Sequence, residues 1–172
     1  MTPATLLDIM RYDLGLSERQ GSGSNPLILE KARRVAAADP SLRWIGHFYH
    51  DDAIPWCGLQ MADVVVRAGA LPPLPNPLSA RAWATWGDDA GKSPLYGAIA
   101  VLTRQGGAHA ALVDGVSTTG AHVRLIGGNQ GDKVSRAWFI KSRIVALRAP
   151  RGVVLPPAPV LRIDNALSTK EA

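Results

Sequence analysis

The spacing of apolar residues changes once along the chain. Over roughly the first half, apolar residues recur every three or four positions, which is the spacing of amphipathic helices. From Gly97 onward they form short runs or alternate with polar residues, which is typical of strands. Helices followed by strands predict the α+β class, with N-terminal helices packed against a C-terminal antiparallel β-sheet meander.

The first two predicted helices span residues 2–14 and 25–38. Thr2 can cap the first, and Gly15 should end it. Asn25 followed by Pro26 is a start signal for the second, after a polar loop at residues 17–24. Its spacing turns Ile28, Ala32 and Val35 inward and leaves Lys31, Arg33 and Arg34 in water. The aromatic residues that follow, Trp44, Phe48 and Tyr49, are expected to be packed.

A third helix is predicted to begin at Cys57 and to stop at Gly69. The residues Cys57, Met61, Val64 and Ala68 follow helical spacing. The valine triplet at 64–66 favours a strand, but Pro55 and Gly69 frame a helix-sized element. A shorter helix should follow at residues 79–86, capped by Ser79 and closed by Gly87.

Strands are predicted at residues 97–103, 108–114 and 121–127, with one or two more within 138–147. Residues 115–120 supply the turn between the second and third of these strands. After Pro150 the chain becomes proline-rich, which predicts an extended arm at residues 151–172 that either packs along the body or binds a neighbour. Residues 1–150 are expected to form one domain.

Composition narrows the functional classes. The 172 residues are 47% hydrophobic and 19% charged, as in ordinary soluble domains. The formal net charge of +5 favours an anionic partner, but Lys and Arg are scattered and no nucleic-acid-binding pattern occurs. The sequence start lacks the features of a signal peptide, and no run is long enough to span a membrane. We therefore expect cytoplasmic synthesis, no membrane insertion, and release by another route if the protein acts outside.

The single cysteine is the first candidate for chemistry. One cysteine excludes an internal disulfide framework and a cysteine-rich zinc site, and the histidines lack zinc-motif spacing, so no metal or cofactor is expected. Cys57 could be a small buried hydrophobe. However, a thiol in the first turn of a helix faces unpaired N–H groups and the positive end of the helix dipole, which favour the nucleophilic thiolate.

A base and an orienting group are expected on the later hairpin. His109 follows two glycines on a predicted strand and is the best candidate base. A turn centred near Ser117 or Thr118 would place His109 roughly opposite Ile126, with Asn129 just beyond. The carboxamide of Asn129 could then fix the imidazole tautomer, and Gln130 and Asp132 are nearby substitutes.

Four sequence blocks resemble one family. They are Asp52–Gly58 (DAIPWCG), Leu78–Gly87 (LSARAWATWG), Gly106–His109 (GGAH) and Leu125–Gln130 (LIGGNQ). In this order they are similar to small phage and bacterial cell-wall hydrolases related to the CHAP amidases and the NlpC-type peptidases. The resemblance implies a papain-like fold and cleavage of an amide bond in peptidoglycan. It assigns Cys57 as nucleophile, His109 as base and Asn129 as the third member.

The same resemblance leaves other roles open. Trp56 and Gln130 are the candidate substrate-binding residues, and Trp83 and Trp86 are assigned to packing in preference to a substrate platform. The alternatives to a hydrolase are a non-catalytic phage structural or wall-binding subunit on the same fold, and an acyltransferase. The oligomeric state and the roles of Asp51 and Asp52 are not determined by the sequence.

Overall fold

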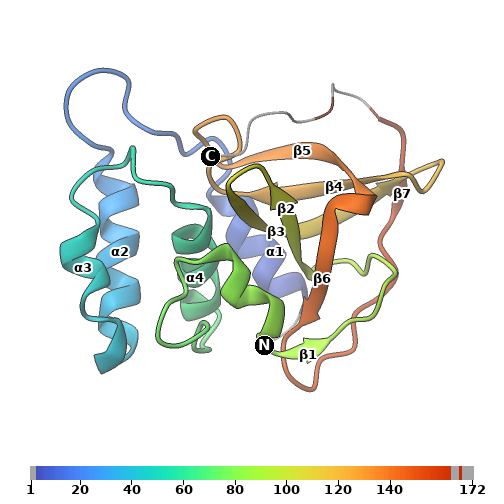
Figure 1. Ribbon diagram of the computed structural model, residues 1–172, viewed down its shortest axis with the longest axis horizontal. Helices are drawn as coiled ribbons and strands as arrows, with labels where there is room; N and C mark the ends of the chain where they lie inside the picture. Colours follow the sequence, from blue (N-terminus) through green and yellow to red (C-terminus); the bar gives the residue numbers. More distant parts are fainter. Residues whose placement is uncertain (1–2, 164–166, 168–172) are drawn as a thin grey trace.

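The computed structural model describes residues 3–163 and 167, and it has the α+β class that the sequence predicts. Helix α4 lies between helix α2 and the sheet, and α1 packs on the same side of the sheet (Figure 1). The α-helices are α1 Pro3–Tyr12, α2 Pro26–Ala38, α3 Ile45–Phe48 and α4 Cys57–Arg67, with short 3-10 segments η1 Pro40–Leu42, η2 Ala80–Thr85 and η3 Lys141–Arg143. The strands are β1 Asp88–Asp89, β2 Ile99–Arg104, β3 Gly107–Ser117, β4 His122–Gly127, β5 Ser135–Ile140, β6 Ile144–Ala149 and β7 Val160–Leu161.

The sheet is antiparallel along its main path but is not a simple meander. Its strand order is β1-β6-β2-β3-β4-β5, and β7 pairs in parallel with the end of β3. The predicted meander is therefore present in β2 to β5, whereas β6 returns across the sheet to pair with β2. The two-residue strands β1 and β7 were not predicted, because so short a segment has no readable alternation.

The register of the β3–β4 hairpin differs from the predicted one. Leu112, and not His109, lies opposite Ile126, and the ladder carries an irregularity between Val113 and Gly115. The turn is also centred later than predicted, because Ser117 still belongs to β3 and the chain reverses through Gly120, whose φ is +70°. The extra residue at the bulge is Asp114, which forms ion pairs with Arg11, Arg124 and Arg136.

Helix α2 follows the predicted stripe, and α1 also buries an apolar face but ends at Tyr12 and not at residue 14. Leu7 and Met10 of α1 are fully buried, and the chain turns away after α1 at Gly15, where φ is +87°. The predicted cap, Thr2, lies outside the described residues. The side chain of Asn25 accepts a hydrogen bond from the N–H of Leu27 at 3.0 Å, as expected at a helix start. The inward residues Ile28, Ala32 and Val35 are buried.

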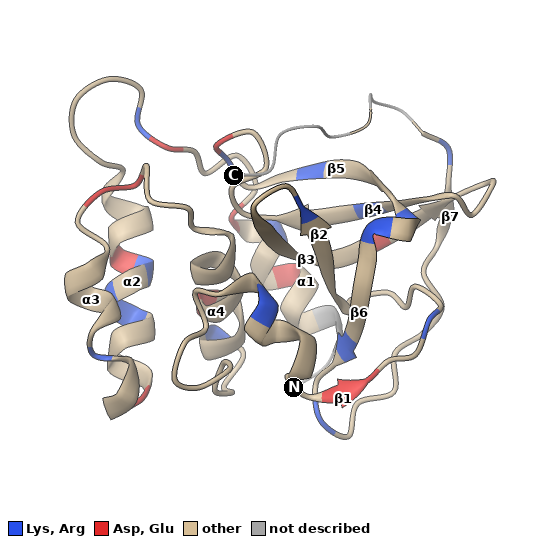
Figure 2. Ribbon diagram, in the orientation of Figure 1, with Lys and Arg blue, Asp and Glu red and all other residues tan. Residues whose placement is uncertain are grey.

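Lys31 corrects the prediction that the basic residues of α2 all face water. It is 4% exposed and its Nζ lies 2.6 Å from Asp13 and 3.0 Å from Asp63. Arg67 contacts both of these carboxylates and Arg34 contacts Asp63, so the ion pairs join α2 to α4 and to the segment after α1. Figure 2 shows both charge signs on α2. Position 31 lies on the same helical face as Ile28 and Val35, so the prediction failed on residue type: a lysine is expected in water unless it is paired, and its carboxylate partners are distant in sequence.

Helix α4 begins at Cys57 as predicted and ends at Arg67, before Gly69, where φ is +81°. Nine consecutive residues, from Cys57 to Val65, are buried. A helix between two packed layers is buried on all sides, so packing outweighs the strand preference of the valine triplet.

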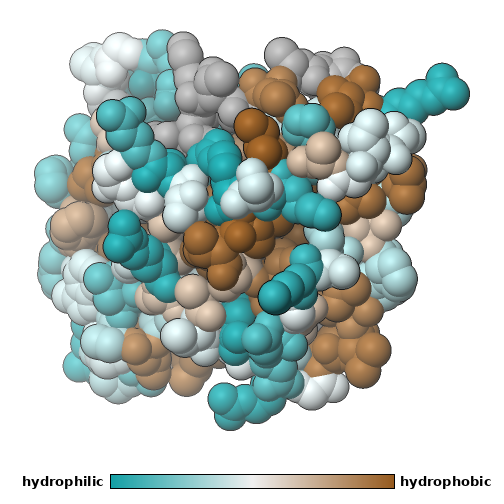
Figure 3. All heavy atoms as spheres, turned by 45° about the vertical axis from the view of Figure 1, so that its right-hand side comes forward, coloured by the Kyte–Doolittle hydropathy of each residue, from teal (hydrophilic) through white to brown (hydrophobic). Residues whose placement is uncertain are grey.

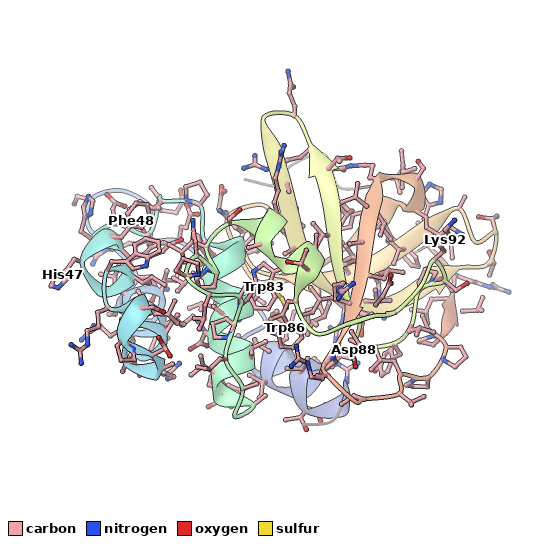
Figure 4. The ribbon with its side chains drawn as sticks, turned by 60° about the horizontal axis from the view of Figure 1, so that its bottom comes forward. His47, Phe48, Trp83, Trp86, Asp88 and Lys92 are labelled. Carbon is pink, nitrogen blue, oxygen red and sulfur yellow. The ribbon has the colours of Figure 1, made fainter. Side chains whose placement is uncertain are left out.

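The aromatic residues are packed only in part. Tyr49 is 4% exposed, but Trp44 and Phe48 are 38% and 46% exposed, which corrects the expectation for both. Trp83 is fully buried on η2, and Trp86 follows at its end; the two rings are 5.6 Å apart (Figure 4). Ser79 precedes η2, but its side chain does not form the predicted cap.

Two hydrophobic cores lie on opposite faces of the sheet. One lies between the helices and the sheet, and the other is formed by the opposite face together with the C-terminal arm. The arm packs along the body: the N–H of Tyr96 bonds Pro156 O at 2.8 Å, and Leu155 is 6% exposed. On the surface seen in Figure 3, hydrophobic residues form separate groups among hydrophilic ones. Among the described residues, no helix is long and apolar enough to cross a membrane.

Candidate active site

Cys57 is the first residue of α4, and its position is fixed from both sides. The preceding loop is held by Tyr49, whose hydroxyl donates to Pro55 O at 2.6 Å. On the other side, a Cβ on Gly58 would lie 2.2 Å from the carbonyl oxygen of Leu78. Only glycine allows the 76–79 loop to approach the first turn this closely. The thiol is therefore presented from a tightly packed helix start.

The Cys57 thiol is paired with His109. Burial by itself would raise the pKa of Cys57, but the hydrogen bond and the charge of His109 outweigh it and hold this pKa below its usual value. The backbone N–H groups of Ala110 and Gly58 also bond the sulfur and act in the same direction. Burial and the charge of Cys57 together raise the pKa of Tyr49. The pair thus favours a thiolate and an imidazolium.

The sheet leaves room for this pair at the start of β3. Strand β2 pairs with β3 over the whole of Gly107 to Leu112, but the β4 ladder begins only at Leu112. One edge of β3 near His109 is therefore not covered by a strand, and the N–H of Ala110 bonds Cys57. The His109 ring is fully buried and stacks on Phe139, with centroids 5.8 Å apart. Burial and stacking therefore hold the imidazole in place.

The residue that orients His109 is Gln130, which corrects the prediction for Asn129. The Nε2 atom of His109 lies 3.0 Å from Oε1 of Gln130. The amide nitrogen of Gln130 donates to Ser135 O at 2.6 Å, so its oxygen is the atom that faces the ring. A carboxamide oxygen only accepts, so Nε2 of His109 carries a proton. Nδ1 is then the ring nitrogen that can exchange a proton with the Cys57 sulfur.

Asn129 is buried beside the pair, but its side chain is hydrogen-bonded to other residues. Its backbone is left-handed, with φ of +57°, because the chain leaves the β4 ladder here in a tight turn. The amide satisfies its surroundings when its oxygen accepts from the N–H of Trp56 at 3.2 Å and its nitrogen donates to Glu18 at 3.2 Å. The turn thus directs Asn129 toward the residue before the nucleophile and Gln130 toward His109.

The predicted substrate contacts of Trp56 and Gln130 are also corrected. Trp56 is fully buried and its indole N–H donates to Glu18 at 2.8 Å, and Gln130 is 3% exposed. Neither side chain is placed to line a cleft. Gly128 explains the close packing, because a Cβ there would lie 2.9 Å from the Trp56 ring. Both side chains support the Cys57–His109 pair from inside the protein.

Two other histidines and the acidic pair Asp51 and Asp52 have different surroundings. His47 is exposed at the outer side of α3, where it points away from the body (Figure 4), and His50 is exposed with Nδ1 3.0 Å from Phe48 O. Asp52 is 2% exposed and accepts the N–H groups of Arg19 and Asn25, both at 2.7 Å, so it shapes the loop before α2. Asp51 is exposed and caps the following turn at Ala53.

A cavity in the protein is distant from this chemistry. It has a volume of about 600 Å³ and lies beyond the C-terminal end of α4, lined by residues that include Gly69, Leu71 and Trp86. Cys57 is at the opposite end of the same helix and is 5% exposed. Within the described part of the chain, no group of three or more His, Cys, Asp or Glu side chains is arranged to hold a metal ion.

Comparisons of the chain with protein-family models, curated proteins and solved structures found no match. The chemical assignment therefore depends on the site itself. A buried thiol with a lowered pKa, an imidazole and a carboxamide that fixes the ring are the parts of a cysteine nucleophile. Such a group can attack an acyl carbon and form a thioester.

Proposed function

We propose that the protein is a cysteine-dependent hydrolase that cleaves an amide bond in peptidoglycan, on a papain-like arrangement of helix and sheet. The observation that carries the proposal is the hydrogen-bonded pair of the Cys57 thiol, in the first turn of α4, and the His109 imidazole of β3. A thiol kept only for packing would have its pKa raised by burial. Gln130 completes the site by holding the imidazole.

The reaction begins with proton transfer from the Cys57 thiol to His109. The thiolate attacks the amide carbonyl carbon, and the carbonyl oxygen becomes an oxyanion. The N–H of Cys57 is in the first turn of α4, has no acceptor within the helix, and can donate to that oxyanion. The C–N bond then breaks as imidazolium gives its proton to the leaving amine, and a thioester on Cys57 remains.

Hydrolysis of the thioester restores the enzyme. Neutral His109 takes a proton from a water molecule, whose oxygen attacks the thioester carbon. The carboxylic product leaves as the thiolate re-forms beside the imidazolium. Gln130 keeps the proton of His109 on Nε2 through both halves, so Nδ1 handles the transferred proton each time.

Peptidoglycan is the proposed substrate for two reasons. The four sequence blocks described above are similar to those of cell-wall hydrolases, and two of them contain Cys57 and His109. The net charge of +5 also favours association with an anionic wall polymer. An acyltransferase would share the thioester and differ only in its acceptor.

Digestion of purified peptidoglycan, followed by mass analysis of the released fragments, tests the proposal. We expect new termini either between muramic acid and the first alanine, for an amidase, or within the stem peptide, for an endopeptidase. Cys57→Ser and His109→Ala should release nothing, while His47→Ala, at an exposed histidine, should act as wild type. Equal release by wild type and Cys57→Ser would refute a cysteine hydrolase. Products joined to an added amine in place of water would assign the transferase instead.

A further inference from the structure

Glu18 lies in the loop after α1, and the backbone fixes its position. The loop runs antiparallel to residues 132–134, with Gly15 N bonded to Val134 O at 2.9 Å and Val134 N to Leu16 O at 2.7 Å. A third bond joins the N–H of Glu18 to Asp132 O at 2.9 Å. The segment that follows the Gln130 turn therefore holds Glu18 in place.

The carboxylate of Glu18 connects the two segments that carry the site. Its Oε1 accepts the indole N–H of Trp56 at 2.8 Å. In the amide orientation that satisfies the neighbours of Asn129, the same oxygen also accepts the Asn129 amide N–H at 3.2 Å. The Asn129 oxygen in turn accepts the backbone N–H of Trp56 at 3.2 Å. These three bonds form a closed triangle. Cys57 follows Trp56 directly, and Gln130 follows Asn129 directly.

The triangle is costly to break, because Trp56 and Asn129 are both fully buried. A buried donor without an acceptor costs about 1–3 kcal/mol. A carboxylate is also costly to keep here: burial first, and then the charges of Asp132, Asp52 and Asp51, raise the pKa of Glu18. One ionised oxygen that serves two donors compensates for part of this cost, since charge-assisted bonds are the stronger ones.

We propose that Glu18 is a positioning residue for the nucleophile, which sets Cys57 and Gln130 at their correct places around His109 through Trp56 and Asn129. The inference rests on the proposed function, in which Cys57 is the nucleophile. Glu18 touches neither the sulfur nor the imidazole. Its effect is to fix the distance between the loop that ends at Trp56 and the turn that presents Gln130.

The measurement is the rate of Cys57 alkylation by iodoacetamide as a function of pH. Cys57 is the only cysteine, so intact mass reports its modification directly. Glu18→Ala removes the shared acceptor, and Glu18→Gln restores an oxygen there. Asn129→Gly removes the other side of the triangle, and glycine accepts the φ of +57° without strain. Glu30→Ala is the matched control, because it removes an exposed glutamate carboxylate on α2.

We expect Glu18→Ala and Asn129→Gly to slow alkylation at pH 6.5 by about tenfold or more, since small displacements of a positioned group have effects of this size. Glu18→Gln should recover most of the rate, and Glu30→Ala should match wild type. Thermal unfolding of each variant separates positioning from loss of the fold. If Glu18→Ala does not fold, the alkylation rates of Asn129→Gly and Glu18→Gln test the positioning role instead.

Two failures are distinguishable. A wild-type thiol with an ordinary pH profile, unchanged by His109→Ala, would overturn the proposed function and the positioning role together. A reactive wild-type thiol whose profile is the same in folded Glu18→Ala and Asn129→Gly would overturn the positioning role alone.

Discussion

Several contributions to the pKa of Cys57 act on its sulfur atom. Burial opposes the thiolate, whereas the imidazole and the N–H groups of Ala110 and Gly58 support it. Loss of the imidazole or of either N–H group should raise the pKa of the thiol. The proposed chemistry therefore depends on the precise arrangement of residues that touch the sulfur.

His109→Ala should show how much of this balance the imidazole supplies. Without its hydrogen bond and charge, burial dominates and raises the pKa of Cys57. A higher pKa leaves less thiolate at neutral pH, so iodoacetamide alkylation at pH 7 should slow by about tenfold or more. The exposed His47→Ala variant is the control. An unchanged rate in His109→Ala would show that the imidazole does not support the thiolate.

Gln130→Ala should lower kcat without an equal change in KM. Gln130 is buried and fixes the His109 tautomer, so its loss misorients the base but removes no substrate contact. We expect kcat for wall hydrolysis to fall by about tenfold to a hundredfold. Gln20→Ala, at an exposed glutamine, should retain the wild-type kcat. A purely raised KM would instead place Gln130 against the substrate.

The sequence alone pointed to Cys57 and His109, but it did not identify the residue that orients His109. A lone cysteine at a helix start and a strand histidine after two glycines are local signals. The choice between Asn129 and Gln130 depends on where the chain leaves the β4 ladder, and adjacent residues in such a turn point in different directions. No sequence pattern pointed to Glu18, because its nearer partner, Trp56, is 38 positions away along the chain.

Among the elements, α4 is the one on which the site depends most. Its first turn presents Cys57, and its later turns are anchored by Asp63, which contacts Lys31, Arg34 and Arg67. Its bounds were predictable, because Pro55 and Gly69 mark a helix-sized segment. The register of the β3–β4 hairpin was not predictable. The bulge at Asp114 and the position of the turn leave too small a mark on the alternation of apolar and polar residues to be recognised.

The ion pairs beneath α4 should make Lys31 important for stability. Lys31→Met leaves two buried carboxylates with less compensation, and removal of one partner of a buried pair costs about 3–5 kcal/mol. Arg33→Met on the same helix removes an exposed charge and should change the free energy of unfolding by less than about 0.5 kcal/mol. Urea unfolding compares the two. Equal stability of both variants would mean that the network contributes nothing to the fold.

For the whole molecule, the order of elements predicted the class but not the topology. Helices before strands imply α+β, and β2 to β5 follow each other in the sheet as expected. Two features depend on contacts between distant segments: β6 pairs with β2, and the arm docks on the body. Local periodicity does not predict such contacts. The arm beyond Pro150 closes the second core and so belongs to the fold over its described length.

Leu155→Ala tests whether the arm is part of the stable structure. Leu155 is 6% exposed in the second core, and truncation of a buried leucine costs about 2–5 kcal/mol. Its neighbour Val154 is 94% exposed, so Val154→Ala should change stability by less than about 0.5 kcal/mol. Thermal and urea unfolding should separate the two variants. If they unfold alike, the arm does not hold the second core closed.

The central claim is that one thiol performs wall hydrolysis, and the single cysteine allows a direct measurement. Wild-type protein is alkylated by iodoacetamide for increasing times, and each sample is divided between intact mass analysis and a peptidoglycan digestion. We predict that fragment release falls in proportion to the fraction of chains modified at Cys57 and reaches zero when all are modified. Full modification with undiminished release would contradict the account.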